Sequence, residues 1–330
     1  MLRIAMIGAG RIGKVHAGNV ALHPRAKLVA VVDPVEASAK ALAGALGCQW
    51  STRPADLIEG REIDAIIVGS PTNTHIELIQ RAAAAGKAVL CEKPIGLDIA
   101  AVDHCLDELK KTPTPLLLGF NRRFDPSAAA MKHAIDAGEI GTLRQVVITS
   151  RDPGPPPLSY VATSGGLFRD MTIHDFDMGR WLLGEEPTEV FACGNVLVDP
   201  QVTRFNDYDT AMVIMRTASG KQCHINNCRQ AAYGYDQRME VLGSSGMITN
   251  DNLCATTLRR SNASATQARE PLLSFFLERY ADSYRFELDA FIDAVLGGKP
   301  VPVGAEDGRH ALLLADAALE SARSGRSVRV

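Results

Sequence analysis

The segment LRIAMIGAGRIG, residues 2–13, determines how the first half of the chain is organised. A short apolar run leads directly into glycines at positions 8, 10 and 13, the spacing G-x-G-x-x-G. In this pattern the glycines permit a tight turn after a strand, close approach of a pyrophosphate, and close packing of the next helix on the strand. The first turn of that helix offers free N–H groups to phosphate oxygens. The segment therefore predicts a strand, a dinucleotide-binding turn and a helix.

Four further apolar runs follow this segment, at 27–33, 63–69, 87–94 and 115–120. The intervening segments carry helix-forming residues and end in glycine, as 75–86 does. The runs are apolar on both faces, which is expected of strands covered by helices on both sides. We therefore predict an α/β domain over residues 1–120, a Rossmann fold with a doubly wound parallel sheet that binds a dinucleotide.

The second apolar run ends in an acid, Asp33, 20 residues beyond Gly13. A carboxylate at this place accepts hydrogen bonds from the adenosine ribose and repels a 2′-phosphate. Residues 34–36 are Pro-Val-Glu and offer no basic side chain to such a phosphate. NAD is therefore favoured over NADP. The alternative is that Asp33 is only a turn residue before proline.

The second half of the chain has a different pattern of apolar segments and turns. It predicts longer strands joined by glycine turns, with hairpins at Ser219-Gly220 and at 244–246, and two closing helices near 276–297 and 305–324. The expected strands lie in segments 142–150, 188–198, 209–228 and 237–250. We predict a second, α+β domain over residues 121–330, with an open, mostly antiparallel sheet flanked by helices.

Composition excludes several classes of protein. The 330 residues carry a net charge of −3, too balanced for a surface that binds nucleic acid or membrane. No apolar run approaches the ~18 residues of a membrane span, and the N-terminus lacks a signal-peptide pattern. The seven cysteines have no paired spacing, which favours reduced thiols in the cytoplasm over disulfides or a zinc cluster.

The segment SPTNTHIE begins at Ser70, where the third apolar run ends. Doubly wound folds bind ligands at the carboxyl ends of their strands. Ser70 and Thr72 are therefore candidate cofactor contacts, and His75 could lie near the nicotinamide ribose. Alternatively, His75 is a surface or capping residue, because Thr74 and Glu77 have the spacing of a capping box.

The fourth apolar run ends in Glu92-Lys93-Pro94, again on the expected ligand side. A residue before proline has its backbone restricted to extended conformations, which limits where the ammonium group of Lys93 can reach. Taken alone, Lys93 could equally be a solvated residue at a strand end.

The segment SGGLFRDMTIHDFD, residues 164–177, places Asp170 four residues before His174, with Asp177 one turn further. On one continuous helix these side chains would share a face. Such a face could be merely solvated, could bind a metal ion, or could hold a general base with its orienting acid.

Five motifs occur in order along the chain: GAGRIG, SPTNTH, CEKPI, GFNRRFDP and GGLFRDMTIHDFDM. In this order and spacing they resemble the Gfo/Idh/MocA oxidoreductase family over nearly the whole chain. GFNRRFDP, SRDPGPPP and LFRDMTIHDFDM resemble most the inositol 2-dehydrogenase subgroup. That subgroup oxidises myo-inositol to 2-keto-myo-inositol with NAD, in inositol catabolism.

The resemblance implies a role for each matching residue. The implied catalytic residues are Lys93, Asp170 and His174. The implied NAD contacts are Gly8, Gly10, Arg11, Ile12, Gly13, Asp33, Ser70, Thr72, His75, Glu92 and Lys93. The implied substrate contacts are Lys93, Arg122 of the Arg122-Arg123 pair, Asp152, Asp170, His174 and Tyr235, preferred to Tyr233. The family also implies a homo-oligomer, a tetramer, assembled through the second sheet.

The chemistry of a secondary alcohol agrees with these roles. Loss of hydride requires a base for the hydroxyl proton, and the imidazole of His174 suits that task. Asp170 would orient it, and Lys93 would stabilise the reacting oxygen. A dehydrogenase of scyllo-inositol, D-chiro-inositol or an aldose would share this trio, so it stays an alternative. An NAD-binding sensor without turnover would not need a base. Asp177 has no assigned role.

Overall fold

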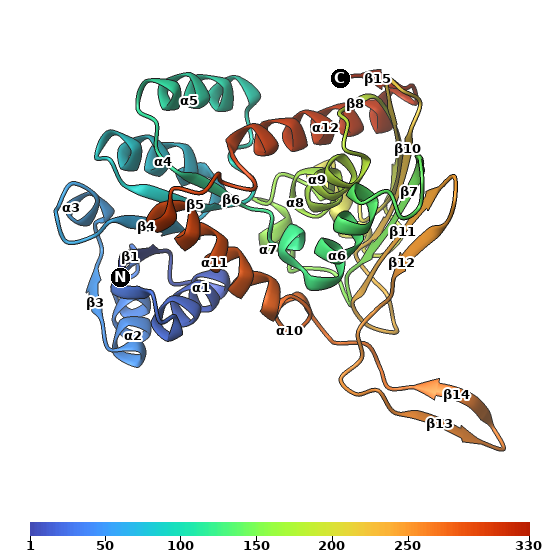
Figure 1. The fold of residues 1–330 in the computed structure, drawn as a ribbon, viewed down its shortest axis with the longest axis horizontal. Coiled ribbons are helices and arrows are strands. Elements are labelled where there is room, and N and C mark those ends of the chain that lie inside the picture. The colour runs from blue at the N-terminus through green and yellow to red at the C-terminus, as the bar shows by residue number, and fades with distance from the viewer. The chain divides into compact units, whose positions relative to one another are not determined.

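Six parallel strands form the first sheet, in the order β3-β2-β1-β4-β5-β6. The computed structural model describes residues 1–330, and Figure 1 shows its elements. The strands are β1 (Leu2–Ile7), β2 (Ala26–Val32), β3 (Gln49–Ser51), β4 (Ala65–Val68), β5 (Ala88–Glu92) and β6 (Leu116–Gly119). This order confirms the predicted Rossmann sheet and puts its switch point between β1 and β4. β3 was not predicted, because its three residues contain no apolar run.

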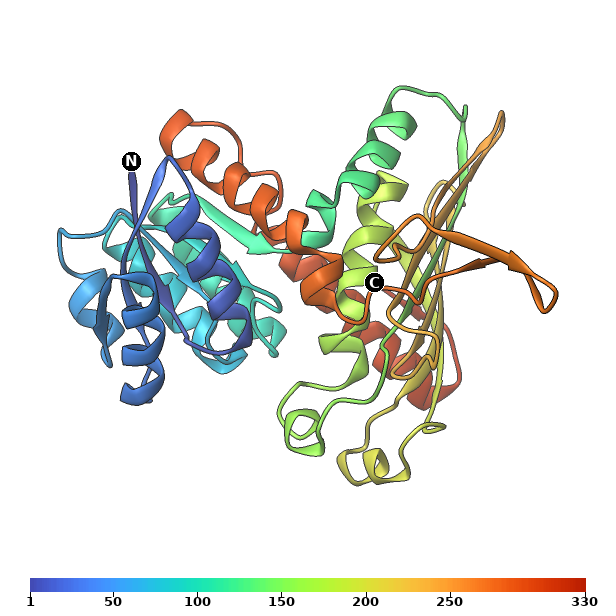
Figure 2. The ribbon, with the colours of Figure 1, turned by 90° about the horizontal axis from the view of Figure 1, so that it is seen from below.

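Helices cover both faces of this sheet (Figure 2). They are α1 (Arg11–Leu22), α2 (Glu36–Leu46), α3 (Pro54–Ile58), α4 (His75–Ala84) and α5 (Ile99–Lys111), with the 3-10 turns η1 (Thr72–Thr74) and η2 (Asn121–Phe124). The strands are consequently buried along their length, and Ile66 and Ile67 of β4 have no exposed surface. Burial on both faces explains why the strands read as continuous apolar runs.

The chain divides into two compact units, each made of two segments. The first unit contains Met1–Phe124 and Asp282–Leu312, and the second contains Asp125–Ala281 and Leu313–Val330. A division at residue 120 alone would place helix α11 (Ala281–Gly297) in the second domain. In the structure, most of this helix instead belongs to the N-terminal unit.

Polar and aromatic contacts fasten α11 to the N-terminal unit. Asp289 lies 2.8 Å from His23 at the end of α1, and the Arg25 guanidinium donates to Asp293 over 2.6 Å. Tyr284 packs edge-on against the ring of His16, with centroids 5.5 Å apart. Residues 282–312 therefore contribute to the nucleotide-binding unit from the far end of the sequence.

Seven strands form the sheet of the second unit, in the order β12-β11-β7-β10-β9-β8-β15. They are β7 (Leu143–Arg151), β8 (Pro187–Asn195), β9 (Thr210–Thr217), β10 (Gln222–Cys228), β11 (Asp236–Gly243), β12 (Met247–Asn250) and β15 (Val328–Arg329). Only β7 and β10 run parallel. The predicted mostly antiparallel sheet and both predicted hairpins are confirmed.

Helices lie on one face of this sheet only (Figure 2). The helical elements of this part of the chain are α6 (Pro126–Asp136), α7 (Leu158–Val161), α8 (Leu167–Asp170), α9 (Thr172–Leu183), η3 (Pro200–Phe205), α10 (Phe276–Arg279) and α12 (Ala305–Ser324). Strand β9 alternates accordingly: Val213 and Met215 are buried, while Met212 and Ile214 are about half exposed, at 49% and 50%. The opposite face therefore exposes apolar side chains such as Met212 and Ile214, and no helix covers it (Figure 2).

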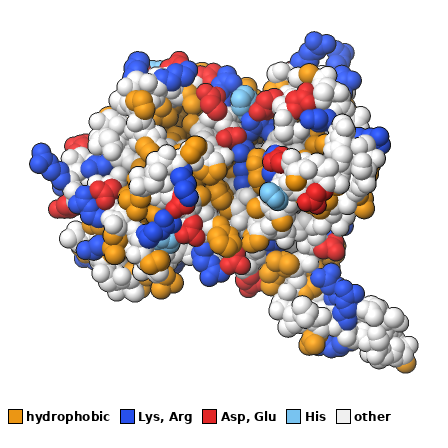
Figure 3. Space-filling view, viewed as in Figure 1, with side chains coloured by type: hydrophobic (Ala, Val, Ile, Leu, Met, Phe, Trp, Pro, Cys, Tyr) orange, Lys and Arg blue, Asp and Glu red, His pale blue; other side chains and the backbone are white.

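A hairpin of β13 (Arg259–Asn262) and β14 (Ala265–Arg269) projects from the second unit (Figures 1 and 2). Nearly all of its residues are exposed, and Figure 3 shows basic side chains along it. Because it lacks an apolar run, nothing in the sequence predicted it. None of the helices is long and apolar enough to cross a membrane.

Candidate active site

The glycine turn after β1 has the geometry that the motif predicted. Gly8 has φ +101°, and a Cβ there would lie 2.6 Å from the carbonyl oxygen of Gly69. A Cβ on Gly13 would lie only 1.9 Å from the Gly8 oxygen. The space beside Gly10, the N-cap of α1, is open. Gly8 and Gly13 are therefore required by packing, and Gly10 leaves a clear approach to the helix N-terminus.

Arg11 and Ile12 form the first turn of α1. The N–H groups of such a turn have no partners within the helix, so they can bind an anion. The side chain of Arg11 is exposed, and Ile12 is partly buried. A Cβ on Gly69 would approach the Ile12 side chain to 3.2 Å, so Ile12 packs where β4 ends. This cradle fits a dinucleotide pyrophosphate.

Asp33 is fixed beside the cradle. Its Oδ2 accepts from the Ala9 N–H, and its Oδ1 accepts from the Val35 N–H, each over 2.8 Å. The bond to Val35 is a turn contact, and the bond to Ala9 ties the carboxylate to the glycine turn. Each carboxylate oxygen keeps a lone pair for a ribose hydroxyl. The turn role and the ribose role are thus compatible.

The loop after β4 differs from the predicted capping box. Thr74 is the N-cap of α4, but its hydroxyl donates to the Pro71 carbonyl (2.7 Å) and lies 2.6 Å from the Ser70 hydroxyl. No side chain caps the helix, so this prediction was wrong. Thr72 opens the 3-10 turn and is partly buried. Ser70 and Thr74 instead brace the loop at the carboxyl edge of the sheet.

His75 is buried, not on the surface. Its Nδ1 lies 2.8 Å from the Pro94 carbonyl and its Nε2 lies 2.9 Å from the Ser70 carbonyl. Burial lowers the pKa of His75 below its usual value. The ring therefore joins the loops that follow β4 and β5. The contact of His75 with the nicotinamide ribose stays a prediction. The two ring nitrogens would not make this contact, because both face carbonyl oxygens of the protein.

Glu92 ends β5 at the same edge of the sheet, and Lys93 follows it. Oε1 of Glu92, a buried side chain, lies 2.8 Å from Nε2 of His16 on α1. Lys93 is partly buried and precedes a cis peptide bond to Pro94. The first unit therefore brings together the glycine turn, Asp33, Ser70 and Lys93 at the carboxyl ends of its strands, where nucleotides bind.

Asp170 and His174 do not share one continuous helix. α8 ends at Asp170 and α9 begins at Thr172, with Met171 between them. The His174 N–H donates to the Met171 carbonyl over 3.3 Å. The expected continuous helix is therefore interrupted at Met171, although the Met171 backbone stays in the right-handed helical region (φ −94°, ψ −59°). The alignment of Asp170 with His174 stays a prediction.

Two side chains that belong to no recognised sequence motif donate hydrogen bonds to the Asp170 carboxylate. The Tyr160 hydroxyl donates to Oδ1 over 2.7 Å, and Nη2 of Arg229 donates to Oδ2 over 3.0 Å. Nη1 of Arg229 lies 3.8 Å from Oδ2 of Asp152. Asp170 and Arg229 are both buried, so these charge-assisted bonds fix the carboxylate. The direction of the strands could have indicated Arg229. β10 runs parallel to β7, so the residues that follow the two strands, Arg229 and Asp152, lie next to each other.

The pKa values of the two new residues follow from this cluster. Burial, and then the charge of Asp170, raises the pKa of the Tyr160 hydroxyl. Burial disfavours the charged form of Arg229, but Asp170 and Asp152 outweigh it and raise its pKa. Tyr160 therefore stays a donor and Arg229 stays a cation at any working pH.

A second polar cluster lies where β7 ends and β11 begins. Nη1 of Arg151 donates to the Tyr233 hydroxyl, which donates to Oδ2 of Asp236, each over 2.7 Å. The Asp152 N–H donates to the Cys228 carbonyl over 2.9 Å. Asp152 is thus anchored by its backbone, and its carboxylate faces Arg229.

Tyr235 and Tyr233 differ in environment. Tyr235 is buried, and its ring packs edge-on against Phe275 and Tyr280, with centroids 6.3 and 6.2 Å apart. Tyr233 is half exposed and belongs to the cluster of Arg151. The choice of Tyr235 as the substrate contact stays a prediction.

The two arginines of η2 also differ. Nη2 of Arg123 donates to Oδ1 of Asp307 over 2.7 Å, and Oδ2 of Asp307 accepts from the Gly304 N–H. Arg123 therefore fastens the first turn of α12. Arg122 is buried within the same short turn, and its role toward substrate stays a prediction.

The remaining acids of the segment 164–177 have partners in the protein. Oδ2 of Asp175 accepts from the Asn227 amide over 2.8 Å, and Asp177 lies 3.7 Å from Arg180. Both acids are fully buried and Asp170 is buried too, so the face with Asp170 and Asp177 is not a solvated one. No group of three His, Cys, Asp or Glu side chains could hold a metal ion. Asp177, which had no assigned role, is part of the core.

Comparison with known proteins agrees with this arrangement. Residues 2–120 match the Gfo/Idh/MocA description "Oxidoreductase family, NAD-binding Rossmann fold", and residues 132–330 match "Oxidoreductase family, C-terminal alpha/beta domain". The chain belongs to the Gfo/Idh/MocA oxidoreductase family. Inositol 2-dehydrogenase of Rhizobium meliloti (strain 1021) is 48% identical over 330 residues, which are 100% of this chain and 99% of the relative.

Solved structures of the Gfo/Idh/MocA family include close neighbours. A myo-inositol dehydrogenase from Corynebacterium glutamicum has a TM-score of 0.97 at 46% identity, covering 100% of this chain and 99% of that one. A scyllo-inositol dehydrogenase from Lactobacillus casei, with bound NAD(H) and scyllo-inositol, has a TM-score of 0.90 at 32% identity, covering 100% and 99%. The chain thus carries an NAD-binding Rossmann domain, and NAD is its cofactor.

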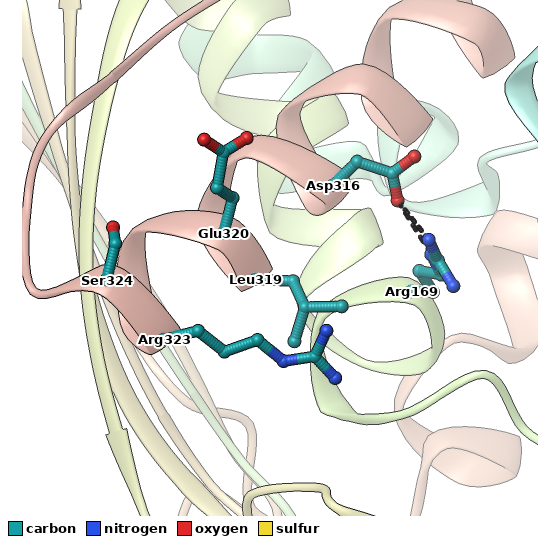
Figure 4. Close-up of a pocket in the computed structure, with 6 residues that line it drawn as sticks. All are labelled: Arg169, Asp316, Leu319, Glu320, Arg323 and Ser324. Atoms are coloured by element: carbon teal, nitrogen blue, oxygen red, sulfur yellow. Dashed lines mark hydrogen bonds and ion pairs between the residues drawn. The ribbon is translucent and has the colours of Figure 1, made fainter.

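One hollow of about 490 Å³ lies on the second unit of this family member (Figure 4). Arg169, next to Asp170, spans it to bond Asp316 of α12 over 2.7 Å. The residues that line the hollow are Arg169, Asp316, Leu319, Glu320, Arg323 and Ser324. None of the predicted site residues is among them, so the hollow is distinct from the candidate active site.

Proposed function

We propose that this chain is an NAD-dependent inositol 2-dehydrogenase that oxidises myo-inositol to 2-keto-myo-inositol. The observation that carries the proposal is the fixed carboxylate of Asp170, one turn of chain before a partly exposed histidine. A buried acid held by two donors is the arrangement that supports a neighbouring cation, here an imidazolium formed by proton uptake. The 48% identity to an inositol 2-dehydrogenase over the full chain supports the substrate.

His174 is the general base of the proposed reaction. It takes the proton of the hydroxyl that is oxidised, because imidazole accepts protons near neutral pH. Asp170 stabilises the imidazolium that results. Lys93 donates a hydrogen bond to the reacting oxygen and stabilises its developing negative charge. Bound NAD supplies the acceptor for the hydride.

Asp33 and the glycine turn hold the cofactor in this proposal. The N–H groups at Arg11 and Ile12 bind the pyrophosphate, and the Asp33 carboxylate accepts from the adenosine ribose. Ser70 and Thr72 follow β4 and Glu92 ends β5, so all three lie at the same edge of the sheet. His75 contributes by packing between the loops after β4 and β5, where the single N–H of its neutral ring donates to one of the two nearby carbonyls.

An uncharged polyol is recognised through many hydrogen bonds. Arg122, Asp152 and Tyr235 are the proposed contacts besides the catalytic trio. The Arg229 contact orients Asp152 together with Asp170, so both acids keep a defined geometry. A site that leaves one polar group unpaired against the wrong epimer discriminates by about 1–3 kcal/mol.

Oxidation of scyllo-inositol, or of another polyol such as D-chiro-inositol or an aldose, is the second candidate. It has a specific basis, since a relative named scyllo-inositol 2-dehydrogenase (NAD(+)) from Bacillus subtilis (strain 168) is 36% identical over this chain. The catalytic trio would be unchanged, and pocket residues alone would select the isomer.

Two further properties belong to the proposal. The exposed apolar face around Phe191, Met212 and Ile214 supports a homotetramer that covers it. The seven cysteines are all free thiols, which supports a reducing, cytoplasmic location.

A substrate panel tests the proposal. Purified protein would be given NAD or NADP with myo-inositol, scyllo-inositol, D-chiro-inositol or glucose, and NADH or NADPH formation would be followed. Rapid turnover of myo-inositol with NAD supports the proposal. Faster turnover of scyllo-inositol would favour the second candidate. Binding of NAD without turnover of any of these compounds would contradict both.

A further inference from the structure

Glu287 of α11 is a fully buried acid that none of the assigned roles uses. It has no exposed surface, and neither of its carboxylate oxygens has a hydrogen-bond partner. Burial of an ionised carboxylate without donors is strongly unfavourable, so such a group keeps its proton instead. Glu287 belongs to the segment that returns from the C-terminal part of the chain to the nucleotide-binding unit.

The neighbour that acts on Glu287 is another carboxyl group, Glu92. Burial, and then the charge of Glu92, raises the pKa of Glu287 well above its usual value. Glu92 is itself held by His16 of α1 at 2.8 Å, and the His16 ring packs on Tyr284, three residues before Glu287. The titratable groups around Glu287 are therefore Glu92 from β5, His16 from α1 and Tyr284 on its own helix.

This cluster includes the residue that directly precedes the predicted catalytic lysine. Glu92 is the last residue of β5, and Lys93 follows it. A second negative charge beside Glu92 would repel it in a dry site and displace the end of the strand. A neutral acid leaves Glu92 in place as the partner of His16.

We propose that Glu287 is a positioning residue that stays protonated in the folded protein, where it keeps Glu92, and through it Lys93, in register at the end of β5. The positioning of Lys93 rests on the proposed function. The protonation of Glu287 does not, since it follows from the contacts of the first unit alone.

The first arm of the test measures the proton directly. Glu287→Gln has nearly the same shape as the protonated acid and cannot ionise. Infrared spectra at neutral pH should contain the carbonyl stretch of a buried carboxylic acid in the parent, and this band should be missing in Glu287→Gln. Asp282→Asn, which removes an exposed acid from the same helix, should retain the band. A parent spectrum without the band would overturn the proposal.

The second arm measures proton linkage to stability. Unfolded Glu287 releases its proton above about pH 4.3, while the folded protein keeps it. The unfolding equilibrium constant of the parent should therefore rise with pH relative to that of Glu287→Gln, by up to about tenfold per pH unit until the folded acid ionises. Parallel pH profiles for the two proteins would overturn the proposal. Asp282→Asn should follow the parent.

The third arm concerns positioning. Glu287→Gln should retain the kcat and KM of the parent at neutral pH, and its kcat should persist at alkaline pH where that of the parent falls. Glu287→Ala, checked for folding by near-ultraviolet circular dichroism, should lose kcat with little change in the KM for NAD. A folded Glu287→Ala with the kcat of the parent would overturn the positioning role. If the parent oxidises no polyol, the proposed function fails. The first two arms still show whether Glu287 is protonated in the folded protein.

Discussion

Arg229 donates a hydrogen bond to the carboxylate of Asp170 over 3.0 Å, although 59 residues separate them in the sequence. Both side chains are buried, and the other oxygen of Asp170 accepts from Tyr160. The acid beside the proposed base is thus a fixed charge with two donors. Its orientation depends on the strand end after β10 as much as on its own helix.

Replacing Arg229 with methionine should damage stability and catalysis together. Removing one partner of a buried ion pair leaves an uncompensated charge, which costs about 3–5 kcal/mol. We expect kcat to fall by about one to two orders of magnitude, part of what general base catalysis contributes. Chemical denaturation and steady-state kinetics would measure both effects. Arg216→Met, which breaks an exposed pair with Glu189, is the control. Arg229→Met with the stability of that control would contradict the assigned contact.

The glycine turn offers a matched pair of substitutions. Gly8→Ala places a Cβ 2.6 Å from a carbonyl oxygen at φ +101°, so we expect a loss of at least about 1–3 kcal/mol of folding stability. Gly10→Ala meets no protein atom within 4 Å, so the fold should survive while NAD affinity falls. Thermal unfolding and NAD titration would separate the two effects. Unchanged NAD affinity in Gly10→Ala would contradict the placement of the pyrophosphate.

Asp33→Asn tests the choice of dinucleotide. The amide keeps the size of the side chain and one acceptor oxygen, but it removes the charge that repels a 2′-phosphate. We expect kcat/KM for NAD to fall about tenfold, equivalent to about 1.4 kcal/mol, and the ratio of NADP to NAD activity to rise. Asp56→Asn, an exposed acid on α3, should leave the ratio unchanged. An equally unchanged ratio in Asp33→Asn would rule out its ribose role.

His75 should make the protein sensitive to mild acid. Its pKa is lowered in the folded state, so below about pH 6.5 the unfolded chain binds a proton that the folded protein excludes. The contribution of His75 to the free energy of unfolding is therefore complete above this pH. It decreases as the pH falls toward the lowered pKa of the folded state. His75→Gln should reduce this dependence in urea titrations at several pH values, whereas exposed His133→Gln should not. Identical profiles for both variants would contradict the buried, neutral state of His75.

The features that could be predicted from the sequence are those specified locally. The strands of the first sheet are apolar on both faces because helices cover them, and a Cβ on Gly13 would clash with the nearby backbone of Gly8. The hairpins at Ser219-Gly220 and 244–246 follow from turn chemistry. The glycine turn and Asp33 could therefore be located without a structure.

The features that were missed depend on distant contacts. Arg229 meets Asp170 only after the second sheet forms, and no motif or spacing marks Tyr160 although it lies near Asp170 in the sequence. The break at Met171 separates Asp170 from the helix of His174. Asp177 received no role from the sequence, because its contact with Arg180 and the packing around both are set by the core. The return of α11 to the first unit likewise has no local signal.

The assignment of His174 as the base is the central claim, and NADH formation by a His174→Gln variant tests it most directly. The amide keeps a polar side chain on α9 but cannot accept the hydroxyl proton. With saturating NAD and myo-inositol, we expect turnover by the parent and a kcat lower by about 100-fold or more in the variant, while NAD binds both proteins equally. A variant that forms NADH as fast as the parent would contradict the account.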